Sequence, residues 1–176
     1  MKPIYALSLL ILSATGQNYK SCSSYLNGSF EFPHLIIPVD SAAPTYAPGT
    51  SFFGQVTSTI SSIFNFDFSP SSQGRTCSLW FLFPKLDNYS FSGDGRVGFS
   101  RLAAPAALYT IYANSPPIQE QLPYVTLVPR SQYLLTSFEC PAGQAIAFRM
   151  DNWGTTYLKY FQDYNPPAIG LYITIC

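Results

Sequence analysis

The chain has 176 residues, nine Lys and Arg against nine Asp and Glu, and a formal net charge of zero; 10% of its residues are charged and 16% are aromatic. This balance excludes a nucleic-acid binder that works by neutralising phosphates, and it excludes a disordered chain, which would be rich in charge and poor in aromatic residues. A coiled coil or helical bundle is disfavoured because Ala, Glu, Lys and Leu do not dominate. The composition is typical of an aromatic-rich β domain.

The N-terminal segment has the pattern of an export signal. Lys2 supplies a positive charge, residues 4–12 are almost uninterruptedly apolar, and the small residues Ala14 and Gly16 stand where a signal peptidase reads its cleavage site. The apolar run is too short for a membrane-spanning helix, which needs about 20 residues. The alternative is a buried N-terminal strand or helix. We expect residues 1–16 to be a signal peptide.

The rest of the chain, residues 17–176, is expected to be a single secreted domain. It contains no internal repeat and no low-complexity linker, and it has the length of one ordinary domain. Asn27 and Asn88 each begin an N-x-S/T sequon. Two sequons behind an export signal predict at least one N-glycan, although either sequon alone can arise by chance.

Alternating apolar and polar residues recur along the chain, and turn residues separate them. Residues 64–68 place three Phe side chains on one face, whereas residues 77–83 are apolar on both faces, as in a covered central strand. Trp80, within that run, is expected in the core. The strand-like runs are residues 30–39, 64–68, 77–83, 96–102, 108–112, 124–128, 133–138, 144–150, 155–160 and 169–175. These runs predict an all-β fold, an antiparallel β-sandwich of about ten short strands stapled by disulfides.

The four cysteines are the basis for expecting disulfides. An even number of cysteines in an exported chain indicates two disulfides, and a metal site is disfavoured because no two cysteines are close in sequence. Four cysteines allow three pairings. Cys77 begins an expected strand and Cys140 follows one, so antiparallel pairing of these strands would bring the two together. Cys22 and Cys176 would then join the two ends of the domain.

Motifs for catalysis or metal binding do not emerge. His34 is the sole histidine and lies in a strand-like run, where a structural role is favoured over a catalytic one. No spacing singles out a pair of carboxylates for glycoside hydrolysis. Asp94 stands between Gly93 and Gly95, which a hairpin turn explains without calcium. We expect no enzymatic activity, no cofactor and no metal.

The strongest binding signal is residues 157–165, where tyrosines stand beside Gln, Asp and Asn. Flat apolar rings with hydrogen-bonding groups at their rim are typical of sugar- or peptide-binding sites. The alternative is that the rings pack in the core and along an edge strand. The candidate ligand-binding residues are Trp153, Tyr157, Tyr160, Gln162, Asp163, Tyr164 and Asn165.

Several segments together resemble a known family, the C-terminal domain of the fungal ubiquitin-three-binding protein But2. The matching segments are residues 30–39, 62–67, 76–84, 89–93, 138–144 and 157–176. Residues 103–121 do not contribute to the resemblance. It implies a β-rich fungal domain, commonly part of secreted or cell-surface proteins, without known catalytic residues. The family is named after binding to the E1 subunit that activates a ubiquitin-like modifier, a cytosolic partner that conflicts with an export signal.

We therefore expect a non-catalytic, secreted fungal module, extracellular or associated with the cell wall, that binds a ligand not yet established or has a structural role. Cell-wall polysaccharide or an extracellular protein is the expected partner, with no nucleic acid and no membrane span. One alternative is an intracellular adaptor for the E1 enzyme of a ubiquitin-like modifier. Another is a small secreted effector or toxin.

Overall fold

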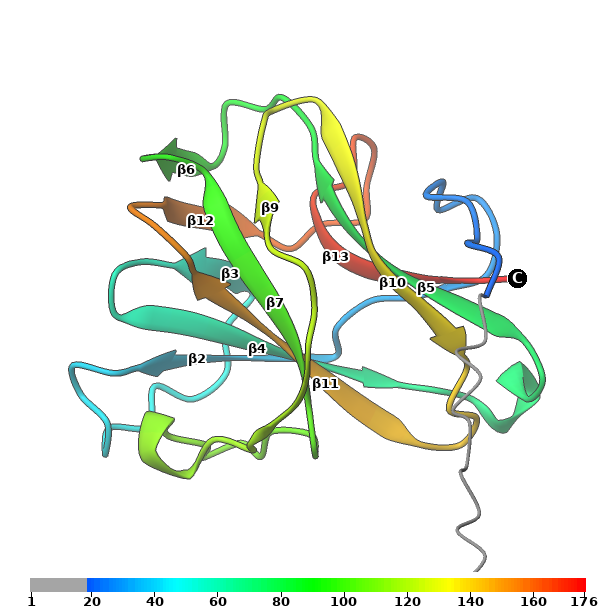
Figure 1. Cartoon of the computed structure of the whole chain (residues 1–176), viewed down its shortest axis with the longest axis horizontal. Coiled ribbons are helices and arrows are strands. Elements are labelled where there is room, and N and C mark those ends of the chain that lie inside the picture. Colours follow the sequence, from blue (N-terminus) through cyan, green and yellow to red (C-terminus); the bar gives the residue numbers. More distant parts are fainter. Residues whose placement is uncertain (1–18) are drawn as a thin grey trace, which may run out of the picture.

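A computed structural model describes residues 19–176 of the chain, so the expected signal peptide, residues 1–16, lies outside the described residues. The described part is almost entirely strands joined by turns (Figure 1). The strands are β1 (Phe30–Glu31), β2 (Leu35–Asp40), β3 (Phe53–Val56), β4 (Ile60–Asp67), β5 (Thr76–Phe83), β6 (Ser90–Ser92), β7 (Arg96–Leu102), β8 (Ile118–Gln121), β9 (Val125–Thr126), β10 (Ser131–Glu139), β11 (Ala145–Asn152), β12 (Tyr157–Phe161) and β13 (Gly170–Ile175). Two short 3-10 helices are η1 (Pro70–Ser72) and η2 (Tyr112–Asn114).

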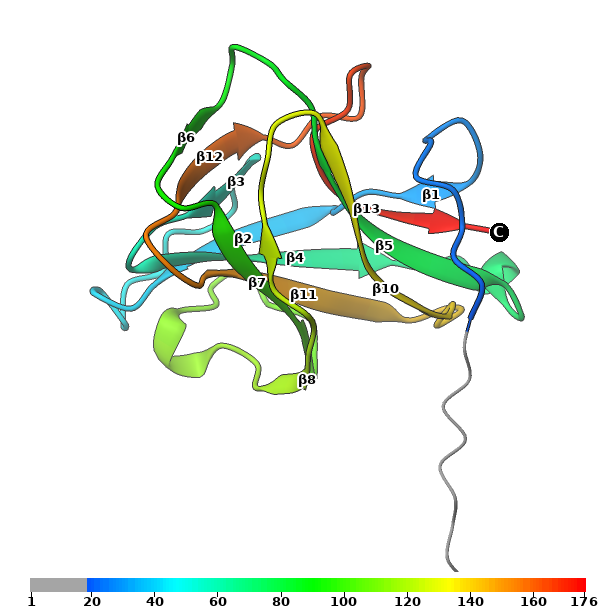
Figure 2. The same cartoon turned by 45° about the horizontal axis from the view of Figure 1, so that its top comes forward.

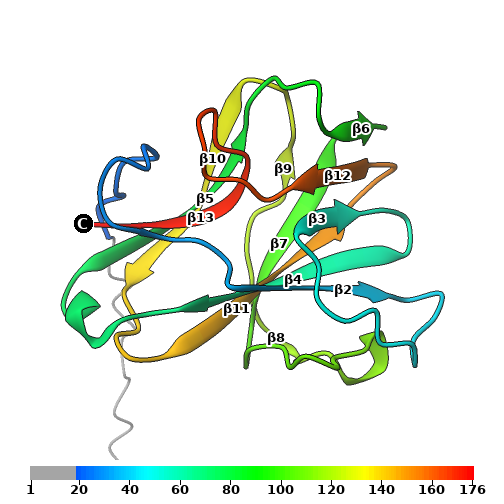
Figure 3. The same cartoon turned by 180° about the vertical axis from the view of Figure 1, so that it is seen from behind.

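The strands form three sheets in which every pairing is antiparallel. Sheet A has the order β1-β13-β5-β10, sheet B has the order β2-β4-β11-β7-β8 with β9 also on β7, and sheet C has the order β3-β12-β6. Figures 2 and 3 show sheet C beside sheet B, with sheet A at the other end of the molecule. The predicted antiparallel β-sandwich is confirmed, with thirteen strands in the described residues where about ten were expected.

The core lies where the inner faces of the three sheets meet, and seven phenylalanines contribute to it beside leucines, isoleucines and valines. Phe81 of sheet A is fully buried, and its ring centroid lies 5.6 Å from that of Phe99 in sheet B and 5.6 Å from that of Tyr160 in sheet C. Phe66 and Phe148 pack edge to face, 6.1 Å apart, on neighbouring strands of sheet B. Burying such a side chain contributes about 1.5–3 kcal/mol to folding. The alternation read from the sequence is therefore the pattern of this core.

The outer face of sheet B is covered by the segment 103–117, which shields a second apolar cluster. Asn65 holds it in place: its side-chain amide donates to the carbonyl of Ala106 at 2.8 Å, and its side-chain oxygen accepts the amide of Ala106 at 3.0 Å. Here the prediction of a strand at residues 108–112 is wrong. The segment folds into turns and η2, because prolines flank it and no neighbouring strand offers it a ladder of hydrogen bonds.

Both expected disulfides are present. Cys77 and Cys140 have their Cα atoms 5.1 Å apart, because β5 and β10 pair with Cys77 opposite Phe138. Cys22 and Cys176 have Cα atoms 5.6 Å apart and tie the N-terminal segment to the end of β13. Each bridge contributes about 2–4 kcal/mol, chiefly by restricting the unfolded chain.

Trp80 does not lie in the core, contrary to the prediction. Leu79 and Phe81 point inward, so strand alternation turns Trp80 to the outer face of sheet A, where it is half-buried opposite Tyr172. Tyr172 is fully buried on that face, and Phe30 packs on it edge to face at 6.2 Å. The run 77–83 is thus covered on both faces, as its composition indicated.

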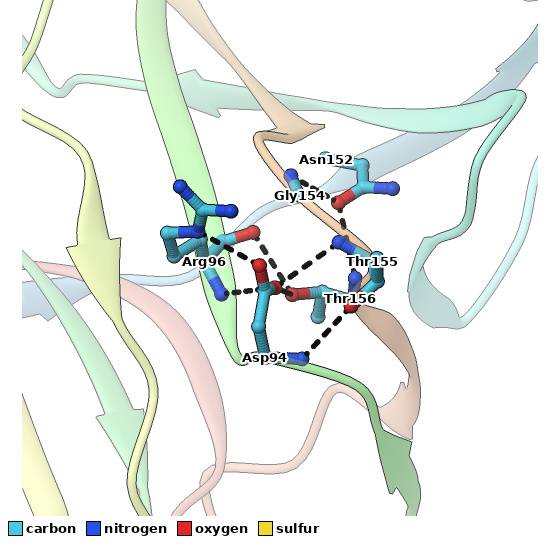
Figure 4. A network of polar contacts seen from close by, with 6 residues as sticks. All are labelled: Asp94, Arg96, Asn152, Gly154, Thr155 and Thr156. Carbon is cyan, nitrogen blue, oxygen red and sulfur yellow. Dashed lines mark hydrogen bonds and ion pairs between the residues drawn. The ribbon is translucent and has the colours of Figure 1, made fainter.

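A network around Asp94 fixes the start of β12 (Figure 4). Its carboxylate accepts Nε–H of Arg96 at 2.8 Å, the amide of Thr155 at 3.1 Å and the hydroxyl of Thr156 at 3.0 Å. The hydrogen bond from Arg96, together with these backbone and hydroxyl donors, holds the pKa of Asp94 well below its ordinary value. The carboxylate therefore locks the β11–β12 turn to the β6–β7 turn.

Candidate functional site

Strand β12 divides the C-terminal aromatic residues between two faces of sheet C. Leu158 and Tyr160 point inward, and the Tyr160 side chain is 1% exposed. Tyr157 and Phe161 point outward, and the Phe161 ring is 44% exposed. Phe53 of β3 pairs with Phe161, and their rings meet edge to face at 5.5 Å. Sheet C therefore presents aromatic rings to solvent on its outer face.

The rings of this face continue into a groove of about 450 Å³, here called the aromatic groove. Its walls are the β1–β2 connection, residues 50–52 before β3, and residues 161–165 at the end of β12. Exposed aromatic rings stand along it: Phe32, Phe52, Phe161 and Tyr164. Phe52 is the most open, at 77% exposure. Polar side chains in the lining are His34, Gln162, Asp163 and Asn165, together with Thr50 and Ser51.

Gln162 anchors the groove wall. Its side-chain amide donates to the carbonyl of Leu171 at 2.9 Å, and its side-chain oxygen accepts the amide of Leu171 at 3.1 Å. Gly170 has φ of 116°, and a Cβ at this position would overlap the Gln162 amide. The Gln162 amide is thus used within the protein, where it joins the end of β12 to β13.

Asp163 and Asn165 shape the turn that carries Tyr164. One oxygen of Asp163 accepts the backbone amide of Asn165 at 2.9 Å and its side-chain amide at 2.7 Å. The main chain of Asp163 also exchanges two hydrogen bonds with Ile169. These contacts project the Tyr164 ring outward, where its centroid lies 5.7 Å from that of Phe32.

The predicted site residues are only partly brought together. Gln162, Asp163, Tyr164 and Asn165 line the aromatic groove, and Tyr157 lies on the same face of sheet C but outside it. The buried ring of Tyr160 offers no surface to a ligand, because strand alternation puts it in the core.

Trp153 lies apart from the groove. It sits in the turn between β11 and β12, and its ring stacks on Tyr124 with centroids 5.2 Å apart and an interplanar angle of 18°. One ring face of each partner is therefore already occupied. The two residues form a separate aromatic pair rather than part of the predicted row.

Sequence reasoning missed Phe32, Phe52 and Phe161 as site residues. Phe161 lies within residues 157–165, and strand alternation indicates that it and its neighbour Tyr160 face opposite sides of the sheet. Phe32 and Phe52 come from distant parts of the chain, and nothing in the sequence joins them.

His34 was expected to be structural. Its backbone amide donates to the carbonyl of Asn65 at 3.1 Å, and its Nδ1 lies 3.2 Å from the carboxylate of Asp67.

The electrostatics of the groove favour an uncharged ligand. Asp163 is the one carboxylate in the lining of the groove, and it already accepts a hydrogen bond from the Asn165 side chain. Close to the groove, burial raises the pKa of Glu31, and the neighbouring charge of Asp67 raises it further. The groove can therefore stack ring faces and hydrogen-bond hydroxyl groups, without a strong charge to attract an ion.

Residues 19–176 contain neither a membrane-spanning helix nor a cluster of metal-ligating side chains. No helix there is long and apolar enough to cross a membrane. In the same stretch no group of three or more His, Cys, Asp or Glu side chains is arranged to hold a metal ion.

Comparison with known proteins places the chain in a family. No curated protein shows a significant match to it. The model of the ubiquitin 3 binding protein But2 C-terminal domain matches residues 31–166, which is more than half of the chain and includes β2 to β12 and every residue that lines the aromatic groove. The chain therefore belongs to the But2 C-terminal domain family, as its sequence motifs indicated.

Proposed function

We propose that the chain is a secreted, non-catalytic module that binds a neutral cell-wall carbohydrate in the aromatic groove. The observation that carries this proposal is the set of four exposed rings, Phe32, Phe52, Phe161 and Tyr164, around one groove with polar side chains. Exposed apolar rings that gather in one patch, rather than standing singly, are typical of an interaction site. Sugar rings pair apolar C–H faces with peripheral hydroxyls, which matches this arrangement.

The rings form two groups on the groove. Phe32 and Tyr164 lie 5.7 Å apart with an interplanar angle of 34°, and Phe52 and Phe161 lie 6.3 Å apart at 39°. Both groups rest on rigid backbone, because Phe161 belongs to a paired strand and Tyr164 to a hydrogen-bonded turn. A preformed surface loses little conformational entropy on binding, which favours affinity for a weakly interacting sugar.

Two observations support export. The chain forms two disulfides, which persist in oxidising compartments. Both sequon asparagines, Asn27 and Asn88, are exposed and lie in turns where an oligosaccharide can be attached. Expression of the full chain in a fungal host tests this directly. We expect the protein in the culture medium to begin at Gln17 and to have a mass four hydrogens below the reduced form. Intracellular, uncleaved protein with free thiols would overturn the proposal of export.

The competing function is an intracellular adaptor for ubiquitin-like conjugation. It is supported by the family description, which names a ubiquitin 3 binding protein. The disulfides argue against a cytosolic site of action, where thiols are kept reduced. The same expression experiment separates the two functions, since an adaptor must remain in the cytosol.

Carbohydrate binding is tested by retention on chitin, on insoluble β-glucan and on whole fungal walls. We expect the wild-type protein to be retained on at least one of them. Phe52→Ala and Phe161→Ala should each weaken retention about tenfold, which corresponds to the loss of about 1.4 kcal/mol from one stacking contact. Tyr109→Ala is the matched control, because Tyr109 is 75% exposed but lies outside the groove. Equal retention of all four proteins, or none for the wild type, would rule out this site.

A further inference from the structure

A second and larger cavity lies on the other side of the Tyr164 turn. It has a volume of about 910 Å³, within the range of small-molecule sites. In Figures 1, 2 and 3 the β12–β13 connection stands between the N-terminal segment and the adjoining ends of β5 and β10. The cavity lies where these segments converge: its lining combines residues 24–27, 82–85, 130–132 and 164–168 with Phe30. We call it the cationic pocket.

The charged side chains in its lining are both cations. Lys85 follows β5 and Arg130 precedes β10, and the pairing of Ser131 with Phe83 brings these two strand ends together. Both side chains are exposed, and among residues 19–176 neither forms an ion pair. Asp87 is near in sequence but does not line the pocket. In a chain of zero net charge, two unpaired cations beside one cavity attract an anion.

Arg130 also has a strained backbone. Its φ of 72° makes it the one residue other than glycine with positive φ among those described. A left-handed conformation costs an arginine free energy that glycine would not lose. Such strain concentrates at functional sites, and here it accompanies a guanidinium placed at the edge of a cavity.

The rest of the lining fits a sugar ring. Tyr25 and Tyr164 expose ring surface, and Phe30 and Leu82 add apolar area. The uncharged polar side chains of Ser131 and Gln132 line the same space. Rings for stacking, an amide and a hydroxyl for hydrogen bonds, and two cations for a carboxylate are the groups that a sugar acid requires.

We propose that the cationic pocket binds a sugar acid, with its carboxylate at Lys85 and Arg130 and its ring against Tyr25 and Tyr164. The ligand is either a free hexuronic acid or one unit of a polyuronic polysaccharide, since both present the same carboxylate and ring. The pocket shares the Tyr164 turn with the aromatic groove, but its two cations, Lys85 and Arg130, lie outside the groove, so carboxylate binding here does not require a ligand in the groove.

The test uses the full chain expressed with Ser29→Ala, because Asn27 lines the pocket and a glycan there would stand at its edge. Trigalacturonate is titrated calorimetrically against its methyl ester, which keeps the rings and removes the charge; galacturonate monomer distinguishes a free acid from a polymer unit. We expect trigalacturonate to bind, with affinity falling as salt is raised, and the ester to bind about tenfold more weakly. Equal binding of acid and ester would overturn the proposal.

Two variants separate binding from folding. Arg130→Gly relieves the positive φ, so we expect an unchanged or higher melting temperature together with an about tenfold weaker affinity for trigalacturonate. Lys85→Gln is expected to weaken binding similarly without changing the melting temperature. Phe161→Ala in the aromatic groove is expected to leave the affinity for trigalacturonate unchanged. Wild-type affinity in Arg130→Gly, or preference for an acidic peptide of equal charge over trigalacturonate, would contradict the proposed site.

Discussion

The two faces of sheet C use the same residue types for opposite purposes. On the inner face, the Tyr160 ring is buried against Phe81 in the common core. On the outer face, the neighbouring Phe161 contacts the rings of Phe52 and Phe53 and stays 44% exposed beside the aromatic groove. Aromatic content by itself therefore does not distinguish core from binding surface. The side of the strand on which each ring stands decides its role, and four measurements test that division.

Replacing the buried ring is expected to have the largest effect. Tyr160→Ala should lower the free energy of unfolding by about 3–5 kcal/mol, because it leaves a cavity where the three sheets meet. Phe161→Ala should lower it by less than about 1 kcal/mol, because much of that ring already contacts water. Urea denaturation monitored by tryptophan fluorescence measures the free energy of unfolding of both variants. Equal losses for the two variants would show that the outer face is also part of the stabilising core.

Gly54 tests how tightly the inner face is packed. Gly54 lies opposite Tyr160 on β3, and a Cβ at this position would overlap the Tyr160 ring. Gly54→Ala is expected to lower the free energy of unfolding by about 1–3 kcal/mol through overpacking. In the Tyr160→Ala background the same change should cost clearly less, because the conflicting ring is gone. Additive losses in the double variant would contradict this account of the contact.

The Asp94 network should control the outer face through the start of β12. The folded state holds the pKa of Asp94 below its ordinary value of 3.8, so its stabilisation is present above that pH and is lost as the pH falls further. Asp94→Asn is expected to lower stability at neutral pH and to flatten the decline in acid. Urea denaturation at a series of pH values measures this. Asp87→Asn is the control, and an identical acid decline in both variants would count against the network.

The smallest effect is expected from the Tyr160 hydroxyl. It is buried and has no hydrogen-bond partner among the described residues, while burial chiefly, with a contribution from Tyr172, raises the pKa of the phenol far above its ordinary value. Tyr160→Phe removes an unsatisfied polar group and should change the free energy of unfolding by less than about 1 kcal/mol, toward greater stability. A large loss would mean that the hydroxyl has a partner in solution.

Much of the fold could be read from the sequence because it depends on local patterns. Residues 64–68 alternate apolar and polar side chains, and residues 77–83 are apolar on both faces, as in half-covered and fully covered strands. The pairing of Cys77 with Cys140 followed from the expected strand ends. The short strands β3, β6 and β8 were not predicted. β3 contains Gly54, and β6 and β8 are mostly polar, so their strand structure comes from the partners that they pair with. Residues 108–112 show the converse, since a strand-like composition without a partner became turns.

The sequence by itself determined the β class, both disulfides and the family, because alternation, cysteine context and motifs are properties of the chain order. Only the tertiary structure decided which aromatic residues face solvent. Tyr157, Tyr160 and Phe161 are all aromatic, and the register of β12 against β3 decides which of them face the core and which face solvent. The tertiary structure also brought Phe32 and Phe52 to Tyr164, and Lys85 to Arg130. Such sites are built by contacts between distant segments, and sequence separation carries no record of those contacts.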